Sequence, residues 1–227
     1  MSISDPVVIA GAARTPMGGF QGELSAMSAA ELGGVAVKAA LEGAGVAPDQ
    51  VDEIVMGNVL GAGQGQAPAR QAAFAAGLPQ DVPASTLNKM CGSGMKTTMI
   101  AHDQLLAGNG SVVVAGGMES MTNAPYLLPK MRGGARLGHG EVKDHMFLDG
   151  LEDAYDKGRL MGTFAEDCAE KYQFTRDEQD AYAIRSLEGA LKAQAEGRFE
   201  REIARDDIGP RRRDRDCLRR AAAQCTA

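Results

Sequence analysis

Short apolar runs alternate with helix-like segments through the first half of the chain, and this alternation restricts the fold more than any other feature. The runs typical of strands occupy residues 7–10, 51–59, 84–88 and 111–115. Helical spacing of apolar residues, with glycines at the ends, lies between them at residues 28–44, 67–76 and 91–107. Strands that alternate with helices form a parallel or mixed sheet covered by helices. We therefore expect an α/β domain over residues 1–117.

The pattern changes near Gly117. Residues 118–149 carry prolines, glycines and scattered charges with little periodicity, and such long loops are usually functional or part of an assembly surface. Helices resume near Thr163, and the sequence from Thr175 to Glu178 is a capping box that predicts a helix ending at Gly197. We expect a second domain over residues 118–204.

The last segment, residues 205–227, differs from both. It holds seven Arg and four Asp but no Lys, and no hydrophobic period. One interpretation is a basic tail that binds nucleic acid. The other is a reading-frame slip in GC-rich DNA, which produces Arg- and Ala-rich sequence unrelated to the domain before it.

Charge and cysteine usage exclude several classes of protein. A net charge of −6 argues against nucleic acid as the main partner, because phosphate binding needs a basic surface. The sequence has no run of 18 apolar residues, so no membrane span is expected, and its first residues do not resemble a secretory signal. The four cysteines (Cys91, Cys168, Cys217 and Cys225) show no CxxC spacing, which predicts reduced thiols and a cytoplasmic location.

Cys91 is the strongest candidate for chemistry. It follows an apolar strand-like run and precedes a helix, with Gly92 and Gly94 allowing close approach of a substrate. A thiol at a helix N-terminus meets unpaired N–H groups and the positive end of the helix dipole, which stabilise a thiolate. The alternative is a buried cysteine that packs as a small hydrophobic residue. The residues alone leave both open.

The other candidates are weaker. Three glycines at positions 61, 63 and 65 miss the spacing of a dinucleotide-binding loop. The three histidines share no ligand spacing with a cysteine or carboxylate cluster, so no metal site is expected (His102, His139 and His145). Cys168 lies in an amphipathic helix and is expected to pack. Ser120 and Thr122 would need a base to act as nucleophiles, and no sequence signal provides one.

At this point the sequence resembles the thiolase family over residues 6 to about 204. Residues 88–94 (Asn-Lys-Met-Cys-Gly-Ser-Gly) resemble its nucleophile signature, and residues 13–16 with 18–20 resemble its start. Further similar stretches are residues 57–61, 65–66, 69–70, 116–121, 123–125, 149–151, 161–163, 165–166 and 176–180. A lysine beside the nucleophile, here Lys89, resembles the acetyl-CoA acetyltransferase branch of the family more than its other branches.

The resemblance implies a layered fold of two similar α/β halves, each with helices on a five-stranded sheet, and a loop domain inserted in the first. This chain would then hold the N-terminal half and most of the loop domain, with the C-terminal half missing. By the same resemblance the loop domain binds coenzyme A, and residues 127–140 match the loop through which the family forms homotetramers. No tightly bound cofactor and no metal are implied.

The implied activity is an acyl-CoA acyltransferase with a ping-pong mechanism. Cys91 would carry the acyl group as a thioester, and its backbone N–H would contribute to the oxyanion hole. Condensation of two acetyl-CoA to acetoacetyl-CoA, or the reverse thiolysis, is the first interpretation. A degradative 3-ketoacyl-CoA thiolase is the second, and a non-catalytic fragment is the third.

Two departures from the family pattern support these alternatives. The family's catalytic His in a Gly-His-Pro setting, its second Cys and an Asn that holds a water have no counterpart in this sequence. Leu160 stands where many short-chain members have His.

Overall fold

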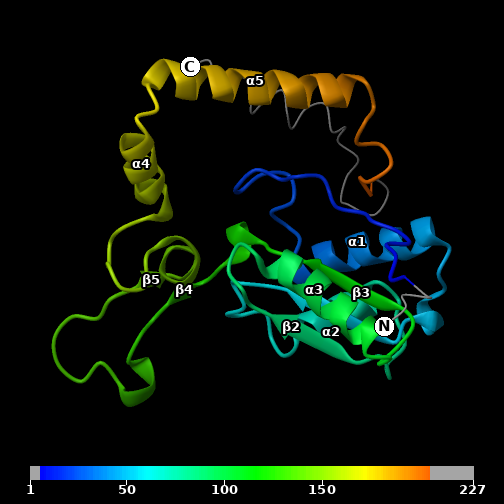
Figure 1. Cartoon of the computed structure of the whole chain (residues 1–227). Coiled ribbons are helices and arrows are strands. Elements are labelled where there is room, and N and C mark those ends of the chain that lie inside the picture. Colours follow the sequence, from blue (N-terminus) through cyan, green and yellow to red (C-terminus); the bar gives the residue numbers. More distant parts are fainter. Residues whose placement is uncertain (1–5, 205–227) are drawn as a thin grey trace. The chain divides into compact units, whose positions relative to one another are not determined.

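The computed structural model describes residues 6–204, and Figure 1 shows their helices and strands. The described chain divides into two compact units, the first of residues 6–125 with 202–204 and the second of residues 126–201. The segment predicted to be a tail or a frame-shifted sequence, residues 205–227, lies outside the described residues.

The first unit is a parallel sheet covered by helices. Along the chain it contains α1 (Ala29–Ala44), β1 (Glu53–Gly57), α2 (Pro68–Ala75), β2 (Ala84–Leu87), α3 (Ser93–Leu106) and β3 (Val113–Gly117). The strands are arranged β2-β1-β3, with both pairs parallel. The α/β prediction is therefore confirmed, and among the described residues this sheet has three strands in place of the five that the resemblance implied.

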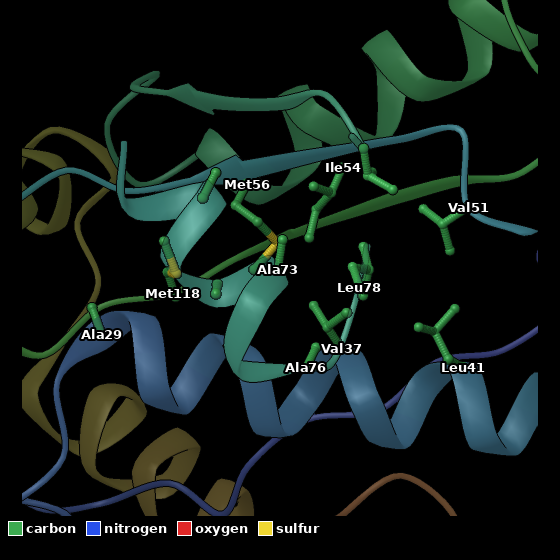
Figure 2. Packing of buried hydrophobic residues seen from close by; sticks show 13 residues of the cluster. Ala29, Val37, Leu41, Val51, Ile54, Met56, Ala73, Ala76, Leu78 and Met118 are labelled. Atoms are coloured by element: carbon green, nitrogen blue, oxygen red, sulfur yellow. The ribbon is translucent and has the colours of Figure 1, made fainter. Parts of the chain in front are cut away.

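The two faces of the sheet carry different helices. Because side chains alternate along a strand, Ile54 and Met56 share one face of β1, and both belong to the main hydrophobic cluster with residues of α1 and α2. Figure 2 shows Val37 and Leu41 rising from α1 toward Leu78 and Val51. The opposite face packs against α3, as expected for right-handed crossovers that run in opposite directions across the sheet, from β1 to β2 through α2 and from β2 to β3 through α3.

Local signals explain where α1 begins and ends. The Ser28 hydroxyl accepts a hydrogen bond from the Glu31 N–H at 3.2 Å, and the Glu31 carboxylate accepts one from the Ser28 N–H at 2.8 Å. Gly45 ends the helix in the left-handed conformation with φ +66°. A Cβ placed at Gly34 would lie 2.5 Å from the Ala75 Cβ, so glycine there permits the close packing of α1 on α2.

Three predictions about element bounds were wrong. Residues 7–10 form no strand, and Ile9 is 83% exposed, because no strand among the described residues pairs with this run. The strand expected at residues 111–115 is observed two residues later, as β3. Pairing with β1 extends it through Gly116 and Gly117, which the low strand propensity of glycine would exclude. The helix expected from Cys91 begins at Ser93.

The second unit has little buried surface. A short antiparallel pair joins β4 (Tyr126–Leu127) to β5 (Lys143–Asp144), and α4 (Met161–Tyr172) and α5 (Arg176–Ala195) follow. The predicted capping box of α5 is present, because the Thr175 hydroxyl accepts from the Glu178 N–H at 3.3 Å. His145 is the only buried residue among residues 126–201. In the part of the chain that the structure describes, no helix has the length and apolar character of a membrane span.

Candidate active site

The carboxyl ends of the three parallel strands place three loops at one edge of the sheet. Cys91 follows β2, Asn58 follows β1 and Glu119 follows β3. In open α/β sheets this edge is where ligands usually bind. Of these residues, only Cys91 was predicted from the sequence. Asn58 and Glu119 are 61 positions apart in the chain, and only the parallel order of the strands brings them together.

The turn that carries Cys91 is held by short hydrogen bonds. The buried Ser93 hydroxyl accepts from the Lys89 N–H at 2.9 Å and donates to the Met90 carbonyl at 2.6 Å. The Asn88 side-chain carbonyl accepts from the Met90 N–H at 2.9 Å. Met90 has a φ of +51°, an uncommon value for a non-glycine residue, so these contacts hold a strained backbone at the residue before Cys91.

Cys91 itself is exposed, which excludes the alternative of a cysteine packed in the core. The N–H groups of the two residues after it are used within the turn: Gly92 donates to the Lys89 carbonyl at 3.2 Å and Ser93 donates to the Met90 carbonyl at 3.0 Å. The Cys91 N–H takes part in none of the backbone hydrogen bonds of this turn. An exposed thiol and an uncommitted N–H therefore belong to the same residue.

Glycines bring the start of α3 close to the sheet. A Cβ placed at Gly57 would lie 2.6 Å from the Ser93 Cβ, so a side chain there would displace the Cys91 turn. One turn further along α3, the fully buried Thr97 donates a hydrogen bond to the Gly116 carbonyl at 2.8 Å. These contacts fix the N-terminus of α3 against the ends of both β1 and β3.

A polar cluster joins the ends of β1 and β3. The Glu119 carboxylate accepts hydrogen bonds from the Asn58 side-chain amide, the Val59 N–H and the Leu60 N–H, each at 2.9 Å. Asn58 is buried, and its backbone N–H donates to the Leu87 carbonyl at 2.9 Å. The cluster therefore connects all three strand ends.

In the second unit an open hollow of about 290 Å³ lies beside β5. Its lining mixes apolar and charged side chains, namely Val142, Lys143, Asp144, Phe147, Leu148, Glu152, Gly158 and Leu160. Nearby, the buried His145 contacts the Asp149 carboxylate at 2.6 Å. Among the described residues, no group of His, Cys, Asp and Glu could hold a metal ion.

The remaining candidates do not gather into a site. Cys168 is exposed on α4, so the prediction that it packs in a core was wrong. His102 is exposed on α3, with its ring 3.3 Å from Asp103. The Ser120 hydroxyl donates to the Met27 carbonyl at 3.1 Å, and the Thr122 hydroxyl accepts from a backbone N–H at 2.8 Å. These contacts are structural and provide neither hydroxyl with a base.

Comparison with known proteins gives consistent results. Residues 7–216 match the model of the thiolase N-terminal domain. The chain is 52% identical over 197 residues to an acetyl-CoA acetyltransferase of Cupriavidus necator, covering 87% of this chain and 50% of that protein. It is 54% identical over 198 residues to acetyl-CoA acetyltransferase 2 of Arabidopsis thaliana, covering 87% of this chain and 49% of that protein.

A similar enzyme of Schizosaccharomyces pombe is 49% identical over 201 residues, covering 88% of this chain and 51% of that protein. The chain thus spans about half the length of the curated relatives it matches. The match to the family model includes the strand ends and the turn that carries Cys91. The chain therefore belongs to the thiolase family of enzymes.

Proposed function

We propose that the protein represented by this chain is an acetyl-CoA acetyltransferase, which condenses two acetyl-CoA to acetoacetyl-CoA or catalyses the reverse thiolysis. The observation that carries the proposal is the turn around Cys91. It presents an exposed thiol at the carboxyl edge of a parallel sheet, two residues before the start of α3. The names of the relatives support the same reaction.

In the first half-reaction the Cys91 thiolate attacks the thioester carbonyl of acetyl-CoA. A C–S bond to Cys91 forms, the bond to the coenzyme A sulfur breaks, and coenzyme A leaves as a thiolate that takes up a proton. The Cys91 N–H, which is not used within the turn, is placed to donate to the oxyanion of the tetrahedral intermediate. Splitting the reaction through a covalent thioester replaces one difficult step with two easier ones.

In the second half-reaction another acetyl-CoA loses a methyl proton, and the resulting carbon nucleophile attacks the acetyl group on Cys91. A C–C bond forms, and Cys91 leaves as a thiolate. This step requires a base that removes the methyl proton. In the first unit, the ring of His102 on α3 contacts the neighbouring Asp103 at 3.3 Å. We therefore infer that the 227-residue chain forms the acetyl-enzyme but does not turn over.

Mass spectrometry of the chain after incubation with acetyl-CoA tests the proposal. We expect one acetyl group on the Cys91 peptide and none on the Cys168 peptide, although both thiols are exposed. A Cys91→Ser variant should lose the hydroxylamine-sensitive acetyl group, and Cys168→Ser should keep it. Acetylation of both cysteines to the same extent would overturn the nucleophile assignment, and sustained Cys91-dependent thiolysis would overturn the absence of turnover. No acetylation at all would favour a non-catalytic fragment.

Leu160 favours a second candidate, a 3-ketoacyl-CoA thiolase that accepts longer acyl chains. Leu160 lines the hollow of the second unit together with Phe147 and Leu148. These three apolar side chains, within a lining that also holds Lys143, Asp144 and Glu152, suit methylene groups better than an acetyl group. Acylation of Cys91 by acetyl-CoA and by octanoyl-CoA, compared in one experiment, separates the two: faster octanoylation supports the second candidate.

We also propose that the whole protein is a homotetramer and that residues 127–140 contribute to its interface. Leu137 is 96% exposed and Leu128 is 57% exposed, and solvent-exposed apolar side chains of this size often mark contact surfaces. Light scattering of the chain and of a Leu137→Asp variant tests this. A chain that is monomeric at all concentrations would contradict a tetramer contact within this half.

A further inference from the structure

We propose that Glu119 is a positioning residue for Cys91, holding the carboxyl edge of the sheet so that the nucleophile turn keeps its place at the start of α3. The inference rests on the proposed role of Cys91 as the nucleophile. Glu119 lies in the loop that follows β3 and makes no hydrogen bond to Cys91 itself, so its action is through the backbone of β1 and β2.

The contacts of Glu119 need a carboxylate. One oxygen accepts from the Asn58 side-chain amide and the Leu60 N–H, and the other accepts from the Val59 N–H. Three donors therefore converge on two acceptor oxygens. Gln has the same shape but only one acceptor oxygen. In Glu119→Gln the side-chain NH2 group would therefore face at least one of these N–H donors, and that donor would lose its acceptor. Buried or half-buried donors that lose their acceptor are costly.

The effect reaches Cys91 through Asn58. The Asn58 side-chain amide donates hydrogen bonds to Glu119 and, at 3.1 Å, to the Met118 carbonyl. The Asn58 backbone N–H donates to the Leu87 carbonyl at 2.9 Å. Leu87 is the last residue of β2, four residues before Cys91. The residue before Asn58 is Gly57, where the backbone packs closely on Ser93, the first residue of α3. Asn58 therefore controls the approach of β1 to both sides of the nucleophile turn.

The opposite edge of the same sheet offers a matched control. Asp52 precedes β1, and its carboxylate accepts from the Ser111 N–H at 2.7 Å and the Val112 N–H at 3.0 Å, just before β3. Asp52 and Glu119 therefore perform the same structural task, joining β1 to β3 by a carboxylate that accepts backbone N–H groups. Only Glu119 lies at the edge that carries Cys91. If Glu119 only stabilised the sheet, substitutions of Glu119 and of Asp52 would change the reactivity of Cys91 to the same extent.

The experiment measures the rate at which iodoacetamide modifies Cys91 in the full chain, with Cys168 of the same molecule as internal reference. Peptide mass spectrometry resolves the two sites, and urea unfolding confirms that each variant is folded under the labelling conditions. The variants are Glu119→Gln, Glu119→Asp and Asp52→Asn. Rates are compared at about pH 7 and at about pH 10, where a thiol is largely ionised in most surroundings.

We expect Glu119→Gln to slow labelling of Cys91 at about pH 7 by about threefold to tenfold, leaving Cys168 unchanged. The difference should shrink at about pH 10, where exposed thiols in general are largely ionised. Glu119→Asp keeps both oxygens and should recover part of the rate, and it provides the test if Glu119→Gln does not fold. Asp52→Asn should leave the Cys91 rate unchanged.

Two results would overturn the proposal: a Cys91 rate that is unchanged in both Glu119 variants, or an equal slowing in Asp52→Asn. Failure of the proposed function gives a different result. In that case Cys91 is labelled no faster than Cys168 in the unmodified chain, whatever residue stands at position 119.

Discussion

The helices of the two units have similar capping signals in their sequences, but they differ in what they pack against. All buried hydrophobic residues of the described chain lie between Ala29 and Met118, in the first unit. In the second unit α5 has 20 residues, none of them buried. Both α1 and α5 nevertheless begin with a complete capping box. Capping and helix propensity therefore specify where a helix forms, and packing of an apolar face supplies most of its stability.

The largest expected contrast comes from one substitution made in both units. Ile54 on β1 is fully buried, and Ile184 on α5 is 58% exposed. We expect Ile54→Ala to lower the free energy of unfolding by about 2–5 kcal/mol. Ile184→Ala should change it by at most about 0.5 kcal/mol, as for most surface substitutions. Urea unfolding followed by circular dichroism measures both.

Tyrosine fluorescence sharpens this comparison, because all four tyrosines lie in the second unit and the chain has no tryptophan (Tyr126, Tyr155, Tyr172 and Tyr182). If the units unfold separately, Ile54→Ala should shift the dichroism transition of the first unit and leave the tyrosine signal in place. A loss of several kcal/mol in Ile184→Ala would contradict the comparison, since it would mean that α5 is covered in solution.

Glycine-to-alanine substitutions should differ in sign between the units. A Cβ at Gly34 would meet the Ala75 Cβ at 2.5 Å, so Gly34→Ala should destabilise the first unit by about 1–3 kcal/mol. Gly189 lies inside α5 with no atom within 4 Å of such a Cβ, so Gly189→Ala should stabilise that helix by about 0.5–1 kcal/mol. Gly43 also has no atom within 4 Å of such a Cβ but lies on α1. Gly43→Ala therefore shows whether the sign depends on the available space or on the unit. Thermal unfolding of the three variants measures these signs.

Much of the first unit could be predicted because its signals are local. Ser28 and Gly45 mark the ends of α1, and Pro68 marks the start of α2. The conformation of residues 7–10 could not be predicted, because an apolar run shows that a strand is possible but not that a neighbouring strand is present to pair with it. The two glycines that end β3 are strand residues only because β1 lies beside them.

The site shows the same division. Cys91 was identified from the glycines and strand that surround it. Asn58 and Glu119 were missed because neither residue has a local signal of chemistry. The expected parallel sheet nevertheless offered a non-local signal, because polar residues that follow two parallel strands lie at the same edge. Asn58 comes one residue after β1, and Glu119 comes two residues after β3.

Removal of the helix caps should affect the two units equally, in contrast to the core substitutions. Ser28→Ala and Thr175→Ala each remove a hydroxyl that accepts a backbone N–H at the start of a helix. Each should cost about 1 kcal/mol. Circular dichroism during urea unfolding would show the loss for Ser28→Ala, and hydrogen exchange of the first turn of α5 would show it for Thr175→Ala. A much larger effect at Ser28 would indicate that burial, not capping, fixes the start of α1.

The smallest expected effect is a dependence on acid that the two capping boxes share. The hydrogen bond from the Ser28 backbone, and then that from its hydroxyl, lowers the pKa of Glu31 below its usual 4.5, and Thr175 lowers the pKa of Glu178 in the same order. A carboxyl whose pKa is lowered in the folded state stabilises that state above its unfolded pKa. The contribution is therefore present above pH 4.5 and is lost as the pH falls through the lowered values.

Glu31→Gln and Glu178→Gln should each reduce the slope of stability against pH in the acid range, measured by urea unfolding for the first unit and by hydrogen exchange for α5. Above this range both variants should be slightly less stable than the unmodified chain. Since both carboxylates lie at the surface of their helices, the reductions should be similar in the two units. A reduction confined to Glu31 would mean that the capping box of α5 forms too rarely in solution to perturb its carboxyl group. The contrast between the units would then extend from packing to helix formation itself.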